Sequence, residues 1–377
     1  MQVRRRLPLF ATALAAAALV LPGAVGIASA SPAPARTASV TDNAAGTTGA
    51  AVSFQVRNVN RSKVPCHADG KTYTVNGHLV GPVGTLASAA GPRAVTLYLH
   101  GLGFGQFFWR FQAVPGYDYA AAQARAGHVS VVIDRLGYDL SGKPYGKNIC
   151  LGAHADIAHQ IVGDLRSGHY TVGGRPVAPH FAKVTLAGHS FGGLISQIEA
   201  YSFGDIDGLI VVAYSDQVVS PLAKRLLAAQ AAKCAAGGQR VDGFGPGGYA
   251  PFAPPPTTTR ALFHDVAPAV LKAALPRLNI DPCGDIASAP AAVKANLANL
   301  HRIKVPVLIV AGGSDALFPP PAGPRQARLF TGARSVTEQT IAGAGHAITL
   351  QRSHDTFQRT VDRWLNSHIE TAATAGH

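Results

Sequence analysis

Runs of apolar and β-branched residues recur along the chain and predict the strands of a sheet. They lie at 52–56, 73–80, 94–99, 129–133, 184–187, 209–213, 305–310 and 335–341. The first two alternate between apolar and polar positions, whereas those from 94–99 to 305–310 are largely apolar, as is typical of parallel strands covered on both faces. Helix-length segments separate them, for example 153–166, and a closing helix is expected over 348–364. This order of elements predicts an α/β fold with a mostly parallel, doubly wound sheet and helices on both faces.

The regular spacing of strands breaks once, between residues 214 and 302. No strand is predicted there, and a helical stretch at 221–236 is followed by glycine- and proline-rich segments. Because the chain returns at both ends to strands of one sheet, we interpret 215–302 as a lid-like insertion between the sixth and seventh strands. A separate domain is the alternative interpretation.

The first thirty residues have the pattern of an export signal. Three arginines at 4–6 precede an alanine- and leucine-rich stretch at 7–21, and the small residues at 28–30 suit a cleavage site. Pro8 and Pro22 make the apolar stretch too short and broken for a transmembrane anchor. We therefore predict a secreted protein without a stable membrane anchor, exported by either the general or the twin-arginine route. The predicted division of the chain is signal peptide 1–30, flexible leader 31–50, first part of the core 51–214, lid 215–302 and second part of the core 303–377.

Composition and charge narrow the classes of partner. Apolar residues make up 47% of the chain and charged residues 14%, so there is enough material for a large core. The net charge of +13 falls to +10 once the three arginines of the signal are removed. These charges are scattered, with no basic stripe interleaved with aromatic residues, so nucleic acid is not an expected partner.

The four cysteines are Cys66, Cys150, Cys234 and Cys283. An even number in a secreted chain favours two disulfides, and three pairings are possible. We favour Cys66–Cys150 with Cys234–Cys283, because the second bond then closes within the insertion. A zinc site is the competing interpretation, but no CxxC motif or close Cys/His spacing supports it.

The candidate chemistry centres on Gly188-His189-Ser190-Phe191-Gly192, which follows a β-run and opens a helical pattern. This is the G-x-S-x-G pattern in its strand–turn–helix context. The glycines let the backbone turn sharply, so Ser190 is exposed at the edge of the sheet. The helix that follows directs free N–H groups at the same point. The stretch therefore predicts a nucleophilic serine rather than an inert turn.

With this motif, the chain resembles an α/β-hydrolase from about residue 52 to its C-terminus. His100-Gly101-Leu102-Gly103 follows the strand at 94–99, where that superfamily has its oxyanion-hole loop. The resemblance implies that the backbone N–H groups of Leu102 and Phe191 stabilise an oxyanion. His100 itself is expected to have a structural, hydrogen-bonding role.

The same resemblance implies a base and an acid for Ser190. His346 lies in Gly343-Ala344-Gly345-His346, between the last strand and the closing helix, where the superfamily has its catalytic histidine. Asp315 follows the strand at 305–310, at the usual position of the acid, and the order Ser–Asp–His is that of the superfamily. Asp216, one strand earlier, is the competing acid.

Other clusters allow both functional and structural interpretations. Phe104, Phe107 and Phe108 follow the oxyanion loop and either fill the core or line an apolar acyl pocket. A metal set at 154, 156 and 159 is rejected, because this spacing does not converge on one helix face and indicates a solvated helix. The glycines at 101–105 do not complete a dinucleotide-binding fingerprint.

Together these features predict a secreted serine hydrolase that cleaves carboxylic esters, with a small-molecule substrate that carries an apolar acyl or aryl group. Ser190, Asp315 and His346 form its triad, and no metal or other cofactor is expected. A peptidase or amidase, or a cofactor-free perhydrolase, shares the same residues, although no obvious charged group is present to recognise a peptide terminus. A non-catalytic binding protein on this fold is disfavoured, because all three triad positions are filled.

Overall fold

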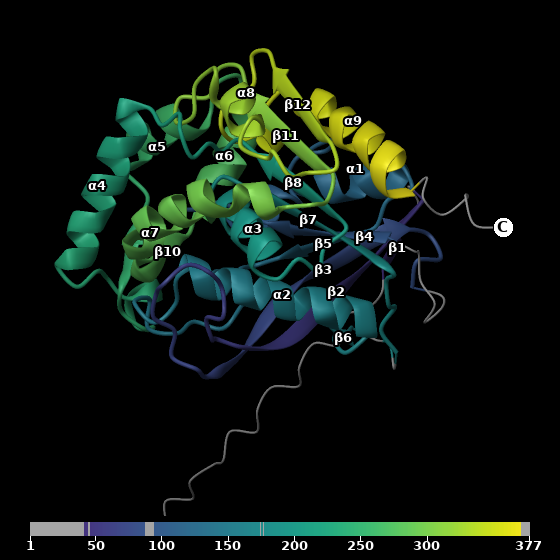
Figure 1. Ribbon diagram of the computed structural model, residues 1–377, viewed down its shortest axis with the longest axis horizontal. Helices are drawn as coiled ribbons and strands as arrows, with labels where there is room; N and C mark the ends of the chain where they lie inside the picture. The colour runs from purple at the N-terminus through teal and green to yellow at the C-terminus, as the bar shows by residue number, and fades with distance from the viewer. Residues whose placement is uncertain (1–40, 44–45, 87–93, 174, 176, 371–377) are drawn as a thin grey trace, which may run out of the picture. The chain divides into compact units, whose positions relative to one another are not determined.

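The computed structural model describes residues 41–43, 46–86, 94–173, 175 and 177–370. The predicted signal peptide and the first half of the leader therefore lie outside the described residues. The described part contains a ten-stranded sheet in the order β1-β2-β3-β5-β4-β7-β8-β11-β12, with β6 paired to β2 (Figure 1). The strands are β1 (Thr41–Asn43), β2 (Thr47–Arg57), β3 (Thr72–Pro82), β4 (Ala94–Leu99), β5 (Ser130–Ile133), β6 (Thr171–Val172), β7 (Lys183–His189), β8 (Gly208–Val212), β11 (Val307–Gly312) and β12 (Val336–Ile341).

The sheet is antiparallel at its beginning and parallel from β5 onward. β1, β2 and β3 pair antiparallel, and β3 also meets β5 antiparallel. All pairs among β5, β4, β7, β8, β11 and β12 are parallel. Every residue of β4, β8 and β11 is buried, as their continuous apolar runs predict, whereas β2 alternates between buried and more exposed positions. The predicted α/β fold with a mostly parallel sheet is thus confirmed. The short strands β1 and β6, with three and two residues, were not predicted because they carry no readable pattern.

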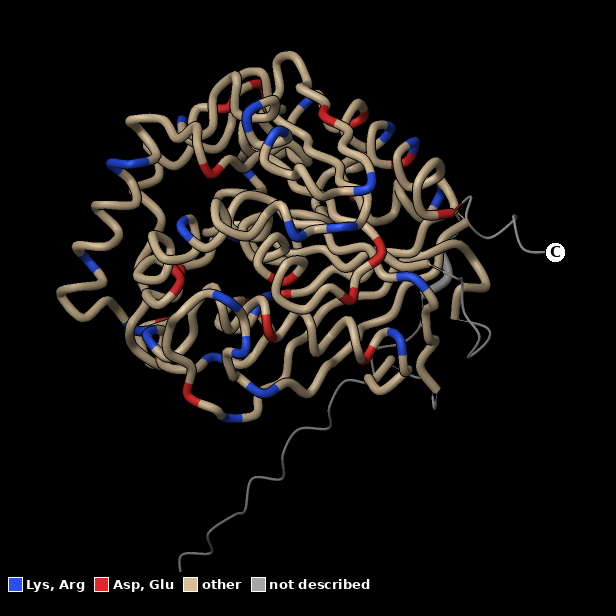
Figure 2. The backbone as a smooth tube through the Cα atoms, viewed as in Figure 1, with Lys and Arg blue, Asp and Glu red and all other residues tan. Residues whose placement is uncertain are grey.

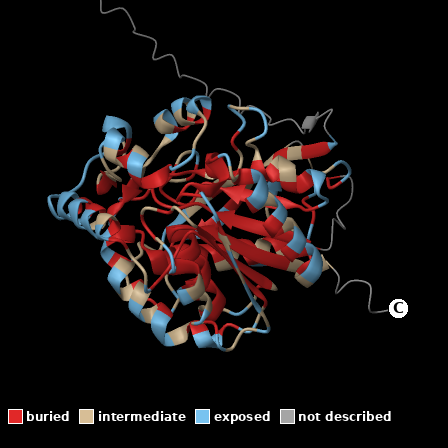
Figure 3. Cartoon of the chain, turned by 90° about the horizontal axis from the view of Figure 1, so that it is seen from above, coloured by how far each residue is buried: buried red, intermediate tan, exposed pale blue. Residues whose placement is uncertain are grey.

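Helices cover both faces of the sheet. α2 (Leu151–Ser167) and α3 (Phe191–Ser202) pack together on one face, and α1 (Tyr119–Arg125) and α9 (His354–Leu365) lie together on the other (Figure 1). Buried residues are concentrated along the strands, and exposed ones lie on the outer sides of the helices (Figure 3). α8 (Ala322–Ala327) follows β11. Short turns of helix lie at Gln106–Phe108, Ile348–Leu350 and Asn366–Glu370.

The segment between β8 and β11 forms a run of helices with one small sheet. Its elements are α4 (Pro221–Ala235), Val241–Gly243, β9 (Tyr249–Pro251), α5 (Pro255–Leu262), α6 (Pro268–Ala274), Leu275–Arg277, β10 (Ile280–Pro282), α7 (Cys283–Asn299) and Leu300–Arg302. β8 and β11 pair directly, so the main sheet continues across the segment. The expectation of no strand here is wrong, since β9 and β10 pair antiparallel. Each has only three residues and ends in proline, which hides it from pattern analysis.

Two disulfides join Cys66 to Cys150 and Cys234 to Cys283, the pairing favoured from the sequence. The first connects the segment after β2 to the start of α2, and the second connects α4 to α7.

The predicted solvated face of α2 is wrong. His154 and Asp156 are buried, because Asp285 and Arg61, both distant in sequence, supply their ionic partners.

Charged residues are dispersed along the backbone rather than gathered in one stripe (Figure 2). Among the described residues, no helix combines the length and apolar character needed to cross a membrane.

Candidate active site

Ser190 occupies a strained turn between β7 and α3. Its φ of 54° and ψ of −122° lie in a region that non-glycine residues rarely adopt, at a cost of about 1–3 kcal/mol. Its N–H donates to the carbonyl of Val212 at 2.8 Å, which anchors the turn to the neighbouring strand. Gly188 is required here, because a Cβ at that position would lie 2.1 Å from the carbonyl oxygen of Gly192. The local sequence therefore folds into the sharp turn predicted for a nucleophile.

The loop after β4 lies directly against this turn. A Cβ on Gly101 would lie 2.8 Å from the Cβ of Ser190, so only glycine allows so close an approach. Leu102 and Phe191 line one small cavity together with Ser190. Neither the N–H of Leu102 nor that of Phe191 donates a hydrogen bond to another described residue. Two free backbone donors thus lie beside the serine, and Phe191 also begins helix α3, where the helix dipole favours negative charge.

His346 and Asp315 are brought together as a buried pair. Nδ1 of His346 lies 2.9 Å from Oδ2 of Asp315. The other carboxylate oxygen, Oδ1, accepts the N–H groups of Leu317 at 2.8 Å and Phe318 at 3.1 Å. Because these backbone donors fix the carboxylate, Asp315 holds one defined orientation toward the imidazole. Both side chains are almost fully buried.

His189 joins the serine turn to the loop that carries His346. Its Nε2 donates to the backbone oxygen of His346 at 3.0 Å, and the two rings lie 4.7 Å apart. Burial, with a smaller contribution from the nearby His346, holds the pKa of His189 well below its usual value, so the ring is neutral near pH 7. This contact was not predicted from the sequence, because it joins residues 157 positions apart. The hydroxyl of Ser190 makes no hydrogen bond to another described residue and remains available toward the cavity.

Asp216, the competing acid, is bound elsewhere. Its carboxylate accepts hydrogen bonds from Tyr214 at 2.7 Å, from Asn296 at 3.1 Å and from Gln326 at 2.7 Å. Burial raises its pKa to about 6, and the hydrogen bonds oppose this shift. The structure therefore brings Asp315, and not Asp216, to His346.

The loop predicted to form the oxyanion hole, residues 100–103, has supports that sequence analysis did not identify. The N–H of Gly103 donates to Oδ1 of Asp281 at 2.6 Å. Tyr138 donates to the same oxygen at 3.0 Å, and Gln230 donates to Oδ2 at 2.7 Å. Arg135 in turn donates to Tyr138 at 2.9 Å. Since Asp281 is 178 residues from Gly103, no local pattern pointed to this contact.

His100 has the structural role expected for it. Its Nε2 accepts the N–H of Arg135 at 3.0 Å, so Nδ1 carries the proton and donates to the oxygen of Gly101 at 2.9 Å. Arg135 also donates from Nε to the carbonyl of His100 at 3.0 Å. Burial holds the pKa of His100 well below its usual value. The neutral ring therefore links the oxyanion loop to the loop after β5.

The cavity at Ser190 is small and apolar, with a volume of about 30 Å³. Besides Ser190 it is lined by Leu102, Phe191, Ala223, Leu226, Leu227, Phe252, Leu317 and Phe318. None of the phenylalanines at 104, 107 and 108 contributes to this lining. Phe104 and Phe108 pack on the ring of His189, with centroids 5.6 and 4.1 Å away, and thereby support the serine turn.

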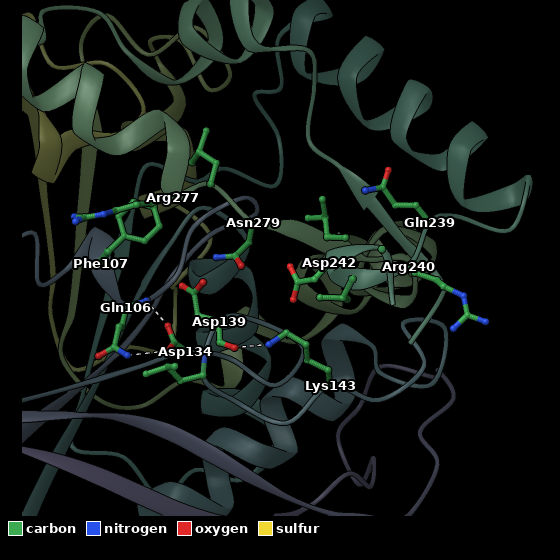
Figure 4. Close-up of a pocket in the computed structure, with 15 residues that line it drawn as sticks. Gln106, Phe107, Asp134, Asp139, Lys143, Gln239, Arg240, Asp242, Arg277 and Asn279 are labelled. Atoms are coloured by element: carbon green, nitrogen blue, oxygen red, sulfur yellow. Dashed lines mark hydrogen bonds between the residues drawn. The ribbon is translucent and has the colours of Figure 1, made fainter. Parts of the chain in front are cut away.

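A larger cavity of about 680 Å³ shares no lining residue with the one at Ser190. It contains Phe107, and in Figure 4 the polar ends of Asp139, Asp242 and Asn279 face one another across it. Asp134, at its base, accepts hydrogen bonds from the backbone and side chain of Gln106, both at 2.7 Å. This polar cavity lacks the serine, the imidazole and the free backbone donors, so the candidate catalytic residues lie at the smaller cavity.

Comparisons with known proteins bear on the family and the fold. Residues 97–359 match the family described as the alpha/beta hydrolase family. Among solved structures, an esterase from Thermogutta terrifontis superposes with a TM-score of 0.57 at 18% identity, over 83% of this chain and 98% of the esterase. An enol-lactonase from Burkholderia xenovorans LB400 gives 0.56 at 18% identity, over 78% and 97% of the two chains. A monoacylglycerol lipase from Paleococcus ferrophilus gives 0.51 at 20% identity, over 73% and 94%. At these identities the solved structures show a shared fold only, and no curated protein matches the chain.

Proposed function

Because the chain belongs to the alpha/beta hydrolase family, we propose that it is a secreted serine hydrolase that cleaves carboxylic esters at Ser190. The observation that carries this proposal is the buried His346–Asp315 pair next to a strained serine turn with two free backbone donors. These are the parts that acyl transfer requires: a nucleophile, a base, a carboxylate that orients the base, and donors for an oxyanion.

The mechanism follows from the orientation of each group. Asp315 accepts a hydrogen bond from the proton that stays on Nδ1 of His346. This tautomer leaves Nε2 unprotonated and able to accept the proton of the Ser190 hydroxyl. The serine oxygen attacks the ester carbonyl, and His346 passes the proton to the leaving alcohol. Water activated by His346 then cleaves the acyl-enzyme and restores the serine. In the free enzyme the Ser–His contact need not be closed, because such hydrogen bonds often shorten only when substrate binds.

The N–H groups of Leu102 and Phe191 would stabilise the negative charge that develops on the carbonyl oxygen. Losing one such donor typically lowers kcat by a factor on the order of 10²–10³. Asp281 acts as a positioning residue in this scheme, since its carboxylate holds the N–H of Gly103 directly after Leu102.

The lining of the small cavity favours an apolar acyl or aryl group. Apart from Ser190, every described residue that lines it has an apolar side chain, so no charged group there would recognise a peptide terminus. Its volume of about 30 Å³ is room for about two water molecules. Since Ala223, Leu226 and Leu227 of α4 form part of its wall, we propose that the 215–302 segment acts as a lid and that α4 shifts when an acyl chain enters.

Two disulfides accord with export to an oxidising compartment. The proposed cleavage after Ala30 predicts that protein recovered from the culture medium begins at Ser31, which N-terminal sequencing tests directly. A mature chain that kept residues 1–30 would contradict the assignment.

The proposed activity is tested with p-nitrophenyl esters of increasing acyl length, compared with aminoacyl anilides. Wild-type protein is expected to release p-nitrophenol, and Ser190→Ala to retain only background turnover. Ser196→Ala is the matched control, because Ser196 is a buried serine of the same helix whose hydroxyl donates to the carbonyl of Gly192. Turnover of anilides without esters would favour an amidase, and ester turnover that survives in Ser190→Ala would overturn the proposal.

A further inference from the structure

Glu199 is a buried carboxylate without a hydrogen-bond donor. It lies near the end of α3 with no exposed surface, and neither of its oxygens accepts a hydrogen bond from a nitrogen or hydroxyl donor of the described residues. The carboxyl group of Asp205 is its hydrogen-bonding neighbour. Buried polar groups in folded proteins are nearly always hydrogen-bonded, and buried charges are paired or bind metals. We therefore expect the carboxyl group of Glu199 to have a binding partner.

Two further metal-binding side chains converge on Glu199. His159 comes from α2 and Asp205 from the loop between α3 and β8, and one potential ligand atom from each of the three residues lies within 4.8 Å of the others. Nδ1 of His159 lies 2.7 Å from Oδ2 of Asp205, while Oδ1 of Asp205 has no partner. Two carboxylates thus lie side by side, each with at least one oxygen unsatisfied.

The arginine near this cluster does not compensate the two carboxylates directly. Arg166 donates at 2.7 Å to the backbone oxygen of Asp205 and at 2.6 Å to the carboxylate of Asp207. Its hydrogen bonds leave the carboxylates of Glu199 and Asp205 free. Either a proton shared between these two groups or a bound cation can resolve their repulsion.

We propose that His159, Glu199 and Asp205 bind one divalent transition-metal ion, with Zn²⁺ as the best match to their chemistry. One imidazole nitrogen and two carboxylate oxygens suit Zn²⁺, whereas Ca²⁺ takes six to eight oxygens. A divalent ion would also neutralise both carboxylates. Tetrahedral zinc ligands lie about 3.3 Å apart at bond lengths of about 2.0–2.1 Å, so small rotations of these side chains would close the site.

The surroundings suit a structural ion with one open position. His159 and Asp205 keep about 30% of their side-chain surface exposed, which leaves access for the metal and for a water as fourth ligand. The ring of His159 stacks on Phe203, with centroids 4.1 Å apart and planes 6° apart, so the plane of the ring is restrained. Spacing along α2 did not reveal the site, because its ligands come from three different elements.

The ion would tie α2 to the end of α3, the helix that begins next to Ser190. Glu199 lies nine residues beyond Ser190, about 13 Å along the helix axis. The bound metal is therefore expected to stabilise the fold and to leave the ester chemistry unchanged.

The test uses the untagged mature chain after treatment with a chelator. Titration with Zn²⁺, followed by calorimetry and by measurement of metal content, is expected to show one tightly bound equivalent and a raised Tm. Co²⁺ in place of Zn²⁺ should give the visible absorption of a tetrahedral complex. Glu199→Gln and His159→Gln should each lose the bound equivalent and the rise in Tm. The partly exposed His159 provides a variant that folds even if Glu199→Gln does not.

His128→Gln is the matched control. His128 also lies beside two carboxylates, 2.9 Å from Asp362 and 3.6 Å from Glu370. The potential ligand atoms of these three residues do not lie as close together as those of His159, Glu199 and Asp205. This variant should keep the bound equivalent. The proposal is overturned if wild type binds no more Zn²⁺ than His159→Gln, or if Zn²⁺ does not change the Tm of wild type. A shared proton would then explain the pair, and Glu199→Gln would preserve stability without any metal.

Discussion

Substituting Asp315 with asparagine tests how the acid acts on His346. In the structure Oδ1 of Asp315 accepts two backbone N–H groups, from Leu317 and Phe318, and Oδ2 faces Nδ1 of His346. Asparagine offers one acceptor oxygen and one NH₂ donor. If its oxygen takes the Oδ1 position, both backbone bonds survive and the NH₂ group faces the imidazole. The reverse orientation would place the NH₂ group against two N–H donors.

The backbone donors decide between these orientations. Each buried donor left unpaired costs about 1–3 kcal/mol, so the first orientation is favoured by about 2–6 kcal/mol. Its NH₂ group requires Nδ1 of His346 to be the acceptor, which moves the ring proton to Nε2. A histidine protonated at Nε2 cannot take the proton of Ser190. With the wrong tautomer, kcat should fall by a factor on the order of 10⁴.

The assay is the steady-state hydrolysis of p-nitrophenyl acetate, together with thermal unfolding of each variant. Asp315→Asn should keep a Tm near that of wild type, because its backbone bonds persist, while its kcat collapses. Asp216→Asn is the control: it disturbs a buried network with Tyr214, Asn296 and Gln326, so Tm should fall while kcat stays near the wild-type value. The opposite result, with activity lost in Asp216→Asn and kept in Asp315→Asn, would refute this reasoning.

Three further predictions concern stability and specificity. Replacing Cys234 and Cys283 with alanine opens a link across 49 residues and should lower the free energy of unfolding in urea by about 4 kcal/mol; an unchanged value would contradict it. Burial raises the pKa of Asp281 to about 7, so the native state binds more protons than the unfolded state, and Tm should rise as pH falls from 8 to 6.5. In Asp281→Asn the dependence of Tm on pH should be weaker than in wild type. An equal dependence in the two proteins would contradict this prediction. Leu226→Ala widens the cavity at Ser190 and should raise kcat/KM for longer acyl chains, by up to about fourfold for each newly accommodated methylene. An unchanged dependence of kcat/KM on acyl length would show that α4 does not form the acyl wall.

The sequence was sufficient to predict the sheet and the local geometry around Ser190. Continuous apolar runs identified the buried parallel strands, because such strands are covered on both faces and tolerate little polarity. The glycine spacing around Ser190 identified the turn, because only a residue without a Cβ fits at Gly188. Both signals are local, and so they can be read along the chain.

Contacts between distant segments could not be read in this way. Asp281 accepts a hydrogen bond from Gly103, 178 residues before it in the sequence. Arg61, itself largely exposed, pairs with a buried aspartate of α2 that the helical spacing had indicated was solvated. The cluster at His159 has the same character, since its three ligands belong to two helices and a loop. Side chains that act through partners more than a hundred residues away, or from neighbouring elements, leave no spacing pattern in the primary structure.

Covalent labelling of the hydroxyl at position 190 tests the central claim most directly. Intact-mass and peptide analysis after incubation with a fluorophosphonate should show one adduct, carried by the serine that follows His189, and the label should vanish in Ser190→Ala. Labelling of another residue, or a wild-type chain that stays unmodified although correctly folded, would contradict the account.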